Sequence, residues 1–241
     1  SFTENIFLKK EVLPDLITGK LLSGTGLSNP LKSFAHLEKL HLKAEEVAGG
    51  YLISGSLPAV SNIGPHQAFA FVADQGKEEK IMGFVYCDTL GITLRERVGF
   101  IGVNGSATYS VTFDEVFIPE EQMISREVDN FIKKIRGYFL AYQIPLAFGL
   151  ITASIEMMEK LEQKHQQNNI NRFLPIQSDQ LRKKYNQLRL QLSKAISQDA
   201  LDWNELTNLR LKSGYVTLEA VQSAMLHHGG GAYVKPSVTE R

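Results

Sequence analysis

The sequence has little cysteine and no surplus of charge of either sign, and both shortages exclude classes of protein. The single Cys87 rules out a disulfide framework within the chain, and no apolar leader opens it, so we expect a cytoplasmic protein. Lys and Arg number 26, as do Asp and Glu, so nothing in the charge favours nucleic acid or an anionic lipid surface as a partner. Gln143, Pro145 and Gly149 interrupt the richest apolar run, Tyr138–Ile155, so we expect no membrane span.

Apolar residues make up 43% of the 241 residues, which is enough for a folded core. Apolar runs of strand length, several of them alternating, recur in the first half of the chain. They are Leu40–Ala44, Tyr51–Ile53, Ala68–Ala73, Lys80–Cys87, Ile92–Val98 and Thr108–Phe117. The Gly49-Gly50 pair between the first two runs indicates a hairpin. So many short strands within about 100 residues predict an antiparallel barrel or sandwich.

The period changes to a helical one near Pro119. Asp129–Lys160 is helical in pattern, and apolar residues recur at steps of four and three from Leu181 to Ala195, in a helix opened near Ser178. Asp202–Glu205 is a capping box for a further helix that reaches about His228. We therefore predict an α+β fold, mainly α with a central antiparallel β domain. Its expected parts are a helical piece at 1–20 that breaks near Pro14, a β domain at 21–125 and a helical bundle at 126–241.

Three short segments combine glycine or proline with small polar side chains. They are Gly24–Pro30, Leu57–Asn62 and His227–Tyr233. Each could bring backbone amides or hydroxyls close to a ligand, but residue type alone favours a turn for the first two and a helix C-cap for the third. Other chemistry is weakly represented. The histidine pair lacks further metal ligands, Cys87 lies in an apolar run and is expected to be buried, and Glu120 and Glu121 are expected to be solvated.

The order of these segments resembles the acyl-CoA dehydrogenase superfamily of FAD flavoproteins. The segments that carry the resemblance are Leu13–Gly19, Gly26–Pro30, Gly49–Gly55, Ala59–Asn62, Thr108–Pro119, Asn171–Phe173 and Gly229–Tyr233. Ala59–Asn62 stands where the family has Trp-Ile-Ser/Thr-Asn, and Gly229–Tyr233 resembles its Gly-Gly-x-Gly-Tyr segment. The resemblance covers nearly the whole chain and implies the family's β domain followed by its C-terminal helical bundle.

The resemblance also implies a cofactor, FAD, and the residues that would bind it. Leu27 and Ser28 would contact the pyrimidine edge of the flavin, and Ser61 would donate toward N5 and O4 with Asn62 close behind. The nucleotide half would be bound by Arg172, Gly229 and Gly230, which in the family serve a neighbouring subunit. The implied activity is α,β-dehydrogenation of an acyl-CoA thioester with hydride transfer to flavin N5, a reaction of lipid metabolism. The implied partners are the acyl-CoA, an electron-transfer flavoprotein or flavin reductase, and further copies of the chain in a dimer or tetramer through the C-terminal helices.

The sequence departs from the family pattern in ways that leave other functions open. Ala59 replaces the family's tryptophan, Asn29 replaces its glutamate, and no residue here is identifiable as the catalytic base. Most of the family's N-terminal helical domain and its last helices have no counterpart here, so we expect this stretch alone to hold FAD poorly. A flavin-dependent monooxygenase of the same superfamily, which needs no α-proton base, is one alternative. A catalytically degenerate paralogue or structural fragment is the other.

Overall fold

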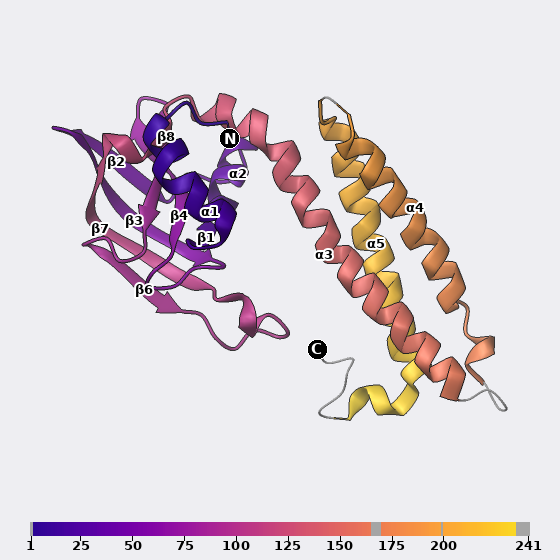
Figure 1. Ribbon diagram of the computed structural model, residues 1–241. Coiled ribbons are helices and arrows are strands. Elements are labelled where there is room, and N and C mark those ends of the chain that lie inside the picture. Colours follow the sequence, from indigo (N-terminus) through magenta and orange to yellow (C-terminus); the bar gives the residue numbers. More distant parts are fainter. Residues whose placement is uncertain (1, 165–169, 199, 235–241) are drawn as a thin grey trace. The chain divides into compact units, whose positions relative to one another are not determined.

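The computed structural model describes residues 2–164, 170–198 and 200–234. Its contacts divide the chain into two compact units, Ser1–Lys134 and Ile135–Arg241. The first holds the β-sheet and the short helices near the N-terminus, and the second holds most of the long helices (Figure 1). The division falls within a long helix, and the predicted domain bounds stay predictions. The predicted α+β class is confirmed.

The first unit is built on an eight-stranded sheet. Its strands are β1 Ser23–Thr25, β2 Leu42–Val47, β3 Gly50–Val60, β4 Ala68–Gly76, β5 Glu79–Tyr86, β6 Ile92–Glu96, β7 Tyr109–Pro119 and β8 Met123–Ser125. The strands follow the order β6-β7-β3-β2-β4-β5-β8, with β1 paired to β4. The β1–β4 and β2–β4 pairings are parallel, so the sheet is mixed and not wholly antiparallel. Alternation along one strand cannot reveal the direction of a partner that is distant in sequence.

Two tight turns set the registers on which the rest of the sheet is built. The predicted hairpin joins β2 to β3, and Gly49 in its turn has a φ of 83°, which suits glycine. The turn between β4 and β5 is tighter than the spacing of the apolar runs Ala68–Ala73 and Lys80–Cys87 indicates. Lys77 and Glu78 both adopt positive φ, 50° and 67°, so the strands run on to Gly76 and restart at Glu79.

The core of the first unit comes from the inward positions of these strands. Phe113 on β7 packs edge-on against Phe69, with ring centroids 5.9 Å apart, and against Phe71 at 5.6 Å. Cys87 is buried beside this core as expected, and burial raises the pKa of its thiol to about 11. The thiol therefore stays protonated at neutral pH and is a poor nucleophile.

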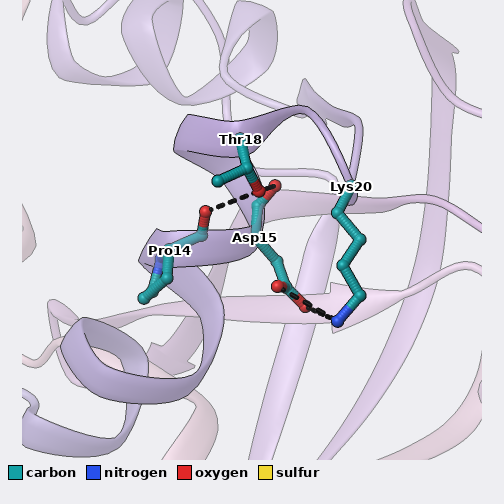
Figure 2. A network of polar contacts seen from close by, with 4 residues as sticks. All are labelled: Pro14, Asp15, Thr18 and Lys20. Atoms are coloured by element: carbon teal, nitrogen blue, oxygen red, sulfur yellow. Dashed lines mark hydrogen bonds and ion pairs between the residues drawn. The ribbon is translucent and has the colours of Figure 1, made fainter.

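The N-terminal helical piece is continuous where the sequence predicted a break. A π-helical turn, η1 (Leu8–Val12), runs directly into α1 (Leu13–Thr18), and Pro14 is the second residue of α1, just after the change from π to α geometry. Figure 2 shows how the end of α1 is closed: the Thr18 hydroxyl donates to the Pro14 carbonyl at 2.9 Å, and Lys20 pairs with Asp15 at 3.2 Å.

The second unit is a three-helix arrangement of α3 (Val128–Lys164), α4 (Ser178–Ile196) and α5 (Trp203–His228) (Figure 1). Its core contains Ile151, Ile155, Leu181, Leu192 and Leu209. Both helix starts match the sequence patterns. Gln177 and Gln180 form a capping box at α4, and Asp202 Oδ1 accepts from the Glu205 amide at 2.6 Å at α5.

The helix α3 meets a criterion that the sequence analysis expected no segment to meet. Among the described residues, one helix, Val128–Gln163, is apolar and long enough to cross a membrane by length and composition. Core helices of soluble proteins pass the same test, and Ile144, Ile151 and Ile155 are fully buried in the cluster shared with α4 and α5. The three-helix core explains part of this apolar composition.

Candidate functional site

The strand end at Ser61 is held by a chain of hydroxyl groups. The last paired residues of β3 and β7 are Val60 and Tyr109, so Ser61 lies opposite Thr108, one step beyond the ladder. The two side-chain oxygens are 2.7 Å apart, and Thr108 Oγ1 is also 2.7 Å from Ser106 Oγ. Thr108 is buried, at 5% exposure, whereas Ser61 is exposed. The protein thus fixes the inner side of Ser61 and leaves its outer side open.

Asn62 completes this turn by contacts on both sides. Its φ of 59° is left-handed, a conformation that asparagine tolerates better than most residues. Its backbone amide donates to the Ser106 carbonyl at 2.9 Å, and its side-chain amide donates to the Ser23 carbonyl at 3.1 Å. We call Ser61 and Asn62 the Ser-Asn turn. It is joined to the loop before β7 and to β1.

The predicted residues Leu27 and Ser28 follow β1 directly, so the structure brings their segment to the Ser-Asn turn. A methyl group on Gly24 would lie 2.4 Å from the Ser61 carbonyl oxygen, which shows how closely the two backbones approach. Leu27 is buried at 4% exposure, while Ser28 is exposed at the first position of α2 (Ser28–Phe34). Of this pair, Ser28 alone has an exposed side chain.

Asn29, which replaces the family's glutamate, has a structural role here. Its side-chain amide donates to the Glu38 carboxylate and to the Lys39 carbonyl, both at 2.8 Å. Its side-chain oxygen accepts from the His41 amide at 3.0 Å. The hydrogen bond from Asn29 lowers the pKa of the Glu38 carboxyl. Asn29 thereby braces the segment that carries Leu27 and Ser28.

The remaining predicted residues gather in the second unit. Asn171, in the short helix η4 (Ile170–Phe173), donates to the His227 carbonyl at 2.8 Å, and His227 Nε2 lies 2.9 Å from the Ile176 carbonyl oxygen. These contacts tie the Arg172 segment to the C-terminal end of α5, where Gly229 and Gly230 follow. The structure therefore joins two segments that are far apart in sequence.

This second cluster presents open backbone. Arg172 is exposed, and its guanidinium lies over the Phe173 ring, 4.7 Å from the centroid. A Cβ at Gly229 or Gly230 would meet nothing within 4 Å. An exposed guanidinium and uncrowded glycine backbone are suited to an anionic group such as a pyrophosphate.

Metal chemistry and a general base find less support. No group of three metal-ligating side chains occurs in the part of the chain that the structure describes, and His227 is engaged with a carbonyl. Glu120 forms an exposed ion pair with Arg126 at 2.7 Å, as expected of a solvated carboxylate. Glu156 is exposed on α3.

Sequence reasoning missed Ser106 and Thr108, although both lie at the start of the strand that carries the family resemblance. The signal was present as two hydroxyl residues immediately before a clear strand. It could be used only with the register of β3 against β7, which places Thr108 opposite Ser61. In donor type and exposure, the hydroxyl of Ser61 fits the polar edge of a planar ring such as flavin.

Comparisons with known proteins agree with this picture, although no family model matches the chain. Benzylmalonyl-CoA dehydrogenase of Aromatoleum aromaticum is 29% identical over 147 residues, 58% of this chain and 39% of that protein. Acyl-CoA dehydrogenase of Bacillus subtilis is 30% identical over 127 residues, 51% of this chain and 33% of that protein. The chain thus matches little more than a third of these relatives.

Solved structures extend the likeness to nearly the whole chain. The glutaryl-coenzyme A dehydrogenase complex with glutaryl-CoA has a TM-score of 0.85 and covers 99% of this chain and 63% of its own, at 18% identity. That identity shows a shared fold, while the curated relatives add a relationship in sequence. The chain is thus similar in sequence to acyl-CoA dehydrogenases over about half its length and shares their fold over nearly all of it.

Proposed function

We propose that the protein is an FAD-dependent oxidoreductase that dehydrogenates an acyl-CoA thioester between its α and β carbons. The observation that carries the proposal is the Ser-Asn turn, a preformed polar edge at the strand end where the superfamily binds its flavin ring. The names of the curated relatives, which are CoA-thioester dehydrogenases, support the same reaction class. FAD, when bound, accepts the hydride. The protein therefore has to bind the cofactor, orient the substrate against the flavin ring and shield both from water.

Each cluster has a part in that work. In the first unit, Ser61 offers its hydroxyl to the N5 and O4 side of the ring, and the exposed Ser28 side chain lies along the pyrimidine edge. In the second unit, Arg172 and the amides of Gly229 and Gly230 bind phosphate oxygens of the nucleotide half. A donor fixed before the ring arrives loses little freedom on binding, and this favours both affinity and a defined reduction potential.

A flavin-dependent monooxygenase is the second candidate, and two observations favour it. Ala59 is exposed where the family pattern has tryptophan, so one wall beside the ring is small. No carboxylate among the described residues is placed so as to mark it as an α-proton base, and a monooxygenase needs none.

We also propose that the helical unit forms a dimer or tetramer. A groove of about 710 Å³ between α3 and α5 is lined mainly by apolar side chains, among them Leu146, Leu150 and Leu218. Leu146 and Leu218 are 73% and 60% exposed, more than a lone bundle needs. Sedimentation at several protein concentrations tests this, and a Leu146→Glu variant should shift the equilibrium toward monomer.

Anaerobic titration of the FAD-loaded, full-length protein with a panel of acyl-CoAs tests the reaction. Bleaching of the flavin absorbance by one or more acyl-CoAs is expected from a dehydrogenase. Bleaching by none of them, together with oxygen consumption that depends on NADPH or a flavin reductase, would replace it with the monooxygenase. Failure of the full-length protein to bind FAD would remove both.

Ser61→Ala tests the assignment of the ring site. Loss of one hydrogen bond to the ring should weaken FAD binding by about 0.5–1.5 kcal/mol and shift the reduction potential. Ser56→Ala is the matched control, because Ser56 is an exposed serine on the same strand whose hydroxyl is 3.4 Å from Thr112. Equal FAD affinity and potential in the Ser61→Ala variant and the wild type would exclude Ser61 from the site.

A further inference from the structure

The side chains of Ser106, Thr108 and Ser61 form a chain of three hydroxyl groups. Together they carry three hydroxyl protons, but only two hydrogen bonds join them. Thr108 takes part in both contacts, each 2.7 Å long. If Thr108 accepted from both serines, its own proton would be buried without an acceptor, which costs about 1–3 kcal/mol. Thr108 therefore donates to one serine and accepts from the other, and one serine keeps a proton that the chain does not use.

The direction of this chain decides what Ser61 offers to the outside. When Ser106 donates to Thr108 and Thr108 donates to Ser61, the Ser61 proton is free to point outward. In the opposite direction Ser61 donates inward to Thr108 and presents only lone pairs. Interconversion needs rotation of three hydroxyl groups and no movement of heavy atoms, so one geometry serves an acceptor or a donor atom on a bound ring.

We propose that Thr108 is a positioning residue for Ser61. Thr108 holds the Ser61 oxygen in place and lets the hydrogen bonds of the hydroxyl chain run in either direction. In one direction Ser61 donates to a ring nitrogen or oxygen that carries no hydrogen. In the other direction it accepts from a ring N–H. This inference rests on the proposed flavin site. Because a flavin gains a proton at N5 when it is reduced, the relay should influence the balance between oxidised and reduced cofactor as well as affinity.

The amides beside the chain support a positioning role. The Asn62 amide donates to the Ser106 carbonyl and the Ile63 amide to the Ala107 carbonyl, at 2.9 and 3.2 Å. The loop that supplies Ser106 and Thr108 is thus already attached to the Ser-Asn turn through its backbone. Removing the Thr108 hydroxyl removes the side-chain part of this attachment and leaves the backbone part in place, which makes the residue testable without loss of the fold.

The test compares Thr108→Val with Thr108→Ser in the full-length protein, with FAD affinity and reduction potential as readouts. Thr108→Val keeps the shape and removes the hydroxyl, so FAD should bind about two- to tenfold more weakly and the potential should shift. Thr108→Ser keeps the hydroxyl and should restore both values. Thr112→Val controls for the substitution itself, since Thr112 is an exposed threonine on the same strand.

The outcomes separate this inference from the proposed function. Wild-type affinity and potential in Thr108→Val, or equal damage in Thr108→Val and Thr108→Ser, would overturn the positioning role while the flavin site stands. A wild-type protein that binds no FAD would overturn the proposed function and the relay with it. Thermal unfolding of the apo variants shows whether a loss of affinity comes from a loss of folded protein.

Discussion

The Ser-Asn turn in the β unit and the Gly229–Gly230 segment in the helical unit both present small polar groups to solvent. They differ in how closely the rest of the protein packs against them. Behind the Ser-Asn turn are a hydroxyl chain, two backbone hydrogen bonds and the crowded backbone of Gly24. Behind Gly229 and Gly230 a Cβ would meet nothing within 4 Å. The first cluster is fixed by the fold itself, whereas the second is open on the side that a ligand or partner would occupy.

This difference shows that glycine has two distinct uses in one chain. At Gly24 the missing side chain lets two parts of the protein meet, so the residue is required for folding whether or not a ligand binds. At Gly230 the missing side chain leaves space that the described part of the protein does not fill. A ligand role is therefore easier to test in the helical unit, where stability and binding can be separated.

Gly24→Ala should have the largest effect on stability, because it adds a methyl group where the protein is already closely packed. The new methyl would lie 2.4 Å from the Ser61 carbonyl oxygen and 2.5 Å from Ile63 Cγ2. Overpacking of this kind costs about 1–3 kcal/mol of unfolding free energy, measurable by urea denaturation. Gly105→Ala is the control, since a Cβ there meets nothing within 4 Å, and it should change stability by less than about 0.5 kcal/mol. Equal losses in both variants would contradict the packing argument.

Local sequence patterns predicted the helical unit better than the sheet. The starts of α4, near Ser178, and of α5, at Asp202, were predicted because helix starts depend on residues within one helical turn, although Gln177 rather than Ser178 caps α4. The turn at Lys77 and Glu78 was missed because neither residue is typical of positive φ, and the flanking strand pairing imposes it. Pro14 was misjudged because the chain stays helical through it, with a change from π to α geometry between Val12 and Leu13 in place of a break.

The candidate site could likewise be predicted from the sequence only where it depends on neighbouring residues in one strand. Ser61 and Asn62 could be chosen from the sequence because they sit at the end of one strand in a recognisable order of motifs. Thr108 could not be chosen, because it lies 47 positions away and its role depends on the register of β7 against β3. The predicted ring-facing role of Ser61 remains a prediction, and the structure adds the residues behind it.

Asp202→Ala should have an intermediate effect, confined to the helical unit. The Asp202 carboxylate accepts from the Glu205 amide at the start of α5, and loss of such a cap costs about 1 kcal/mol. Asp179→Ala is the matched control. Asp179 lies in the first turn of α4, and its exposed ion pair with Lys183, at 3.3 Å, should contribute only about 0.3–0.5 kcal/mol. Hydrogen exchange should show the loss in α5 amides and not in β3 or β7, and a loss spread over both units would contradict the division into two.

Gly230→Ala should have the smallest effect on stability and is the sharpest test of the open cluster. Because a Cβ meets nothing within 4 Å there, the free energy of unfolding should change by less than about 0.5 kcal/mol. If phosphate oxygens approach this backbone, the same methyl should weaken FAD binding about tenfold, or about 1.4 kcal/mol. Gly149→Ala, inside α3, should leave FAD affinity unchanged, because a Cβ there also meets nothing within 4 Å and that glycine belongs to neither cluster. Unchanged affinity in both variants would show that the space at Gly230 is not a ligand site. Weakened affinity in Gly230→Ala alone would show that the space is kept for the ligand, because stability gives no other reason for a glycine at that position.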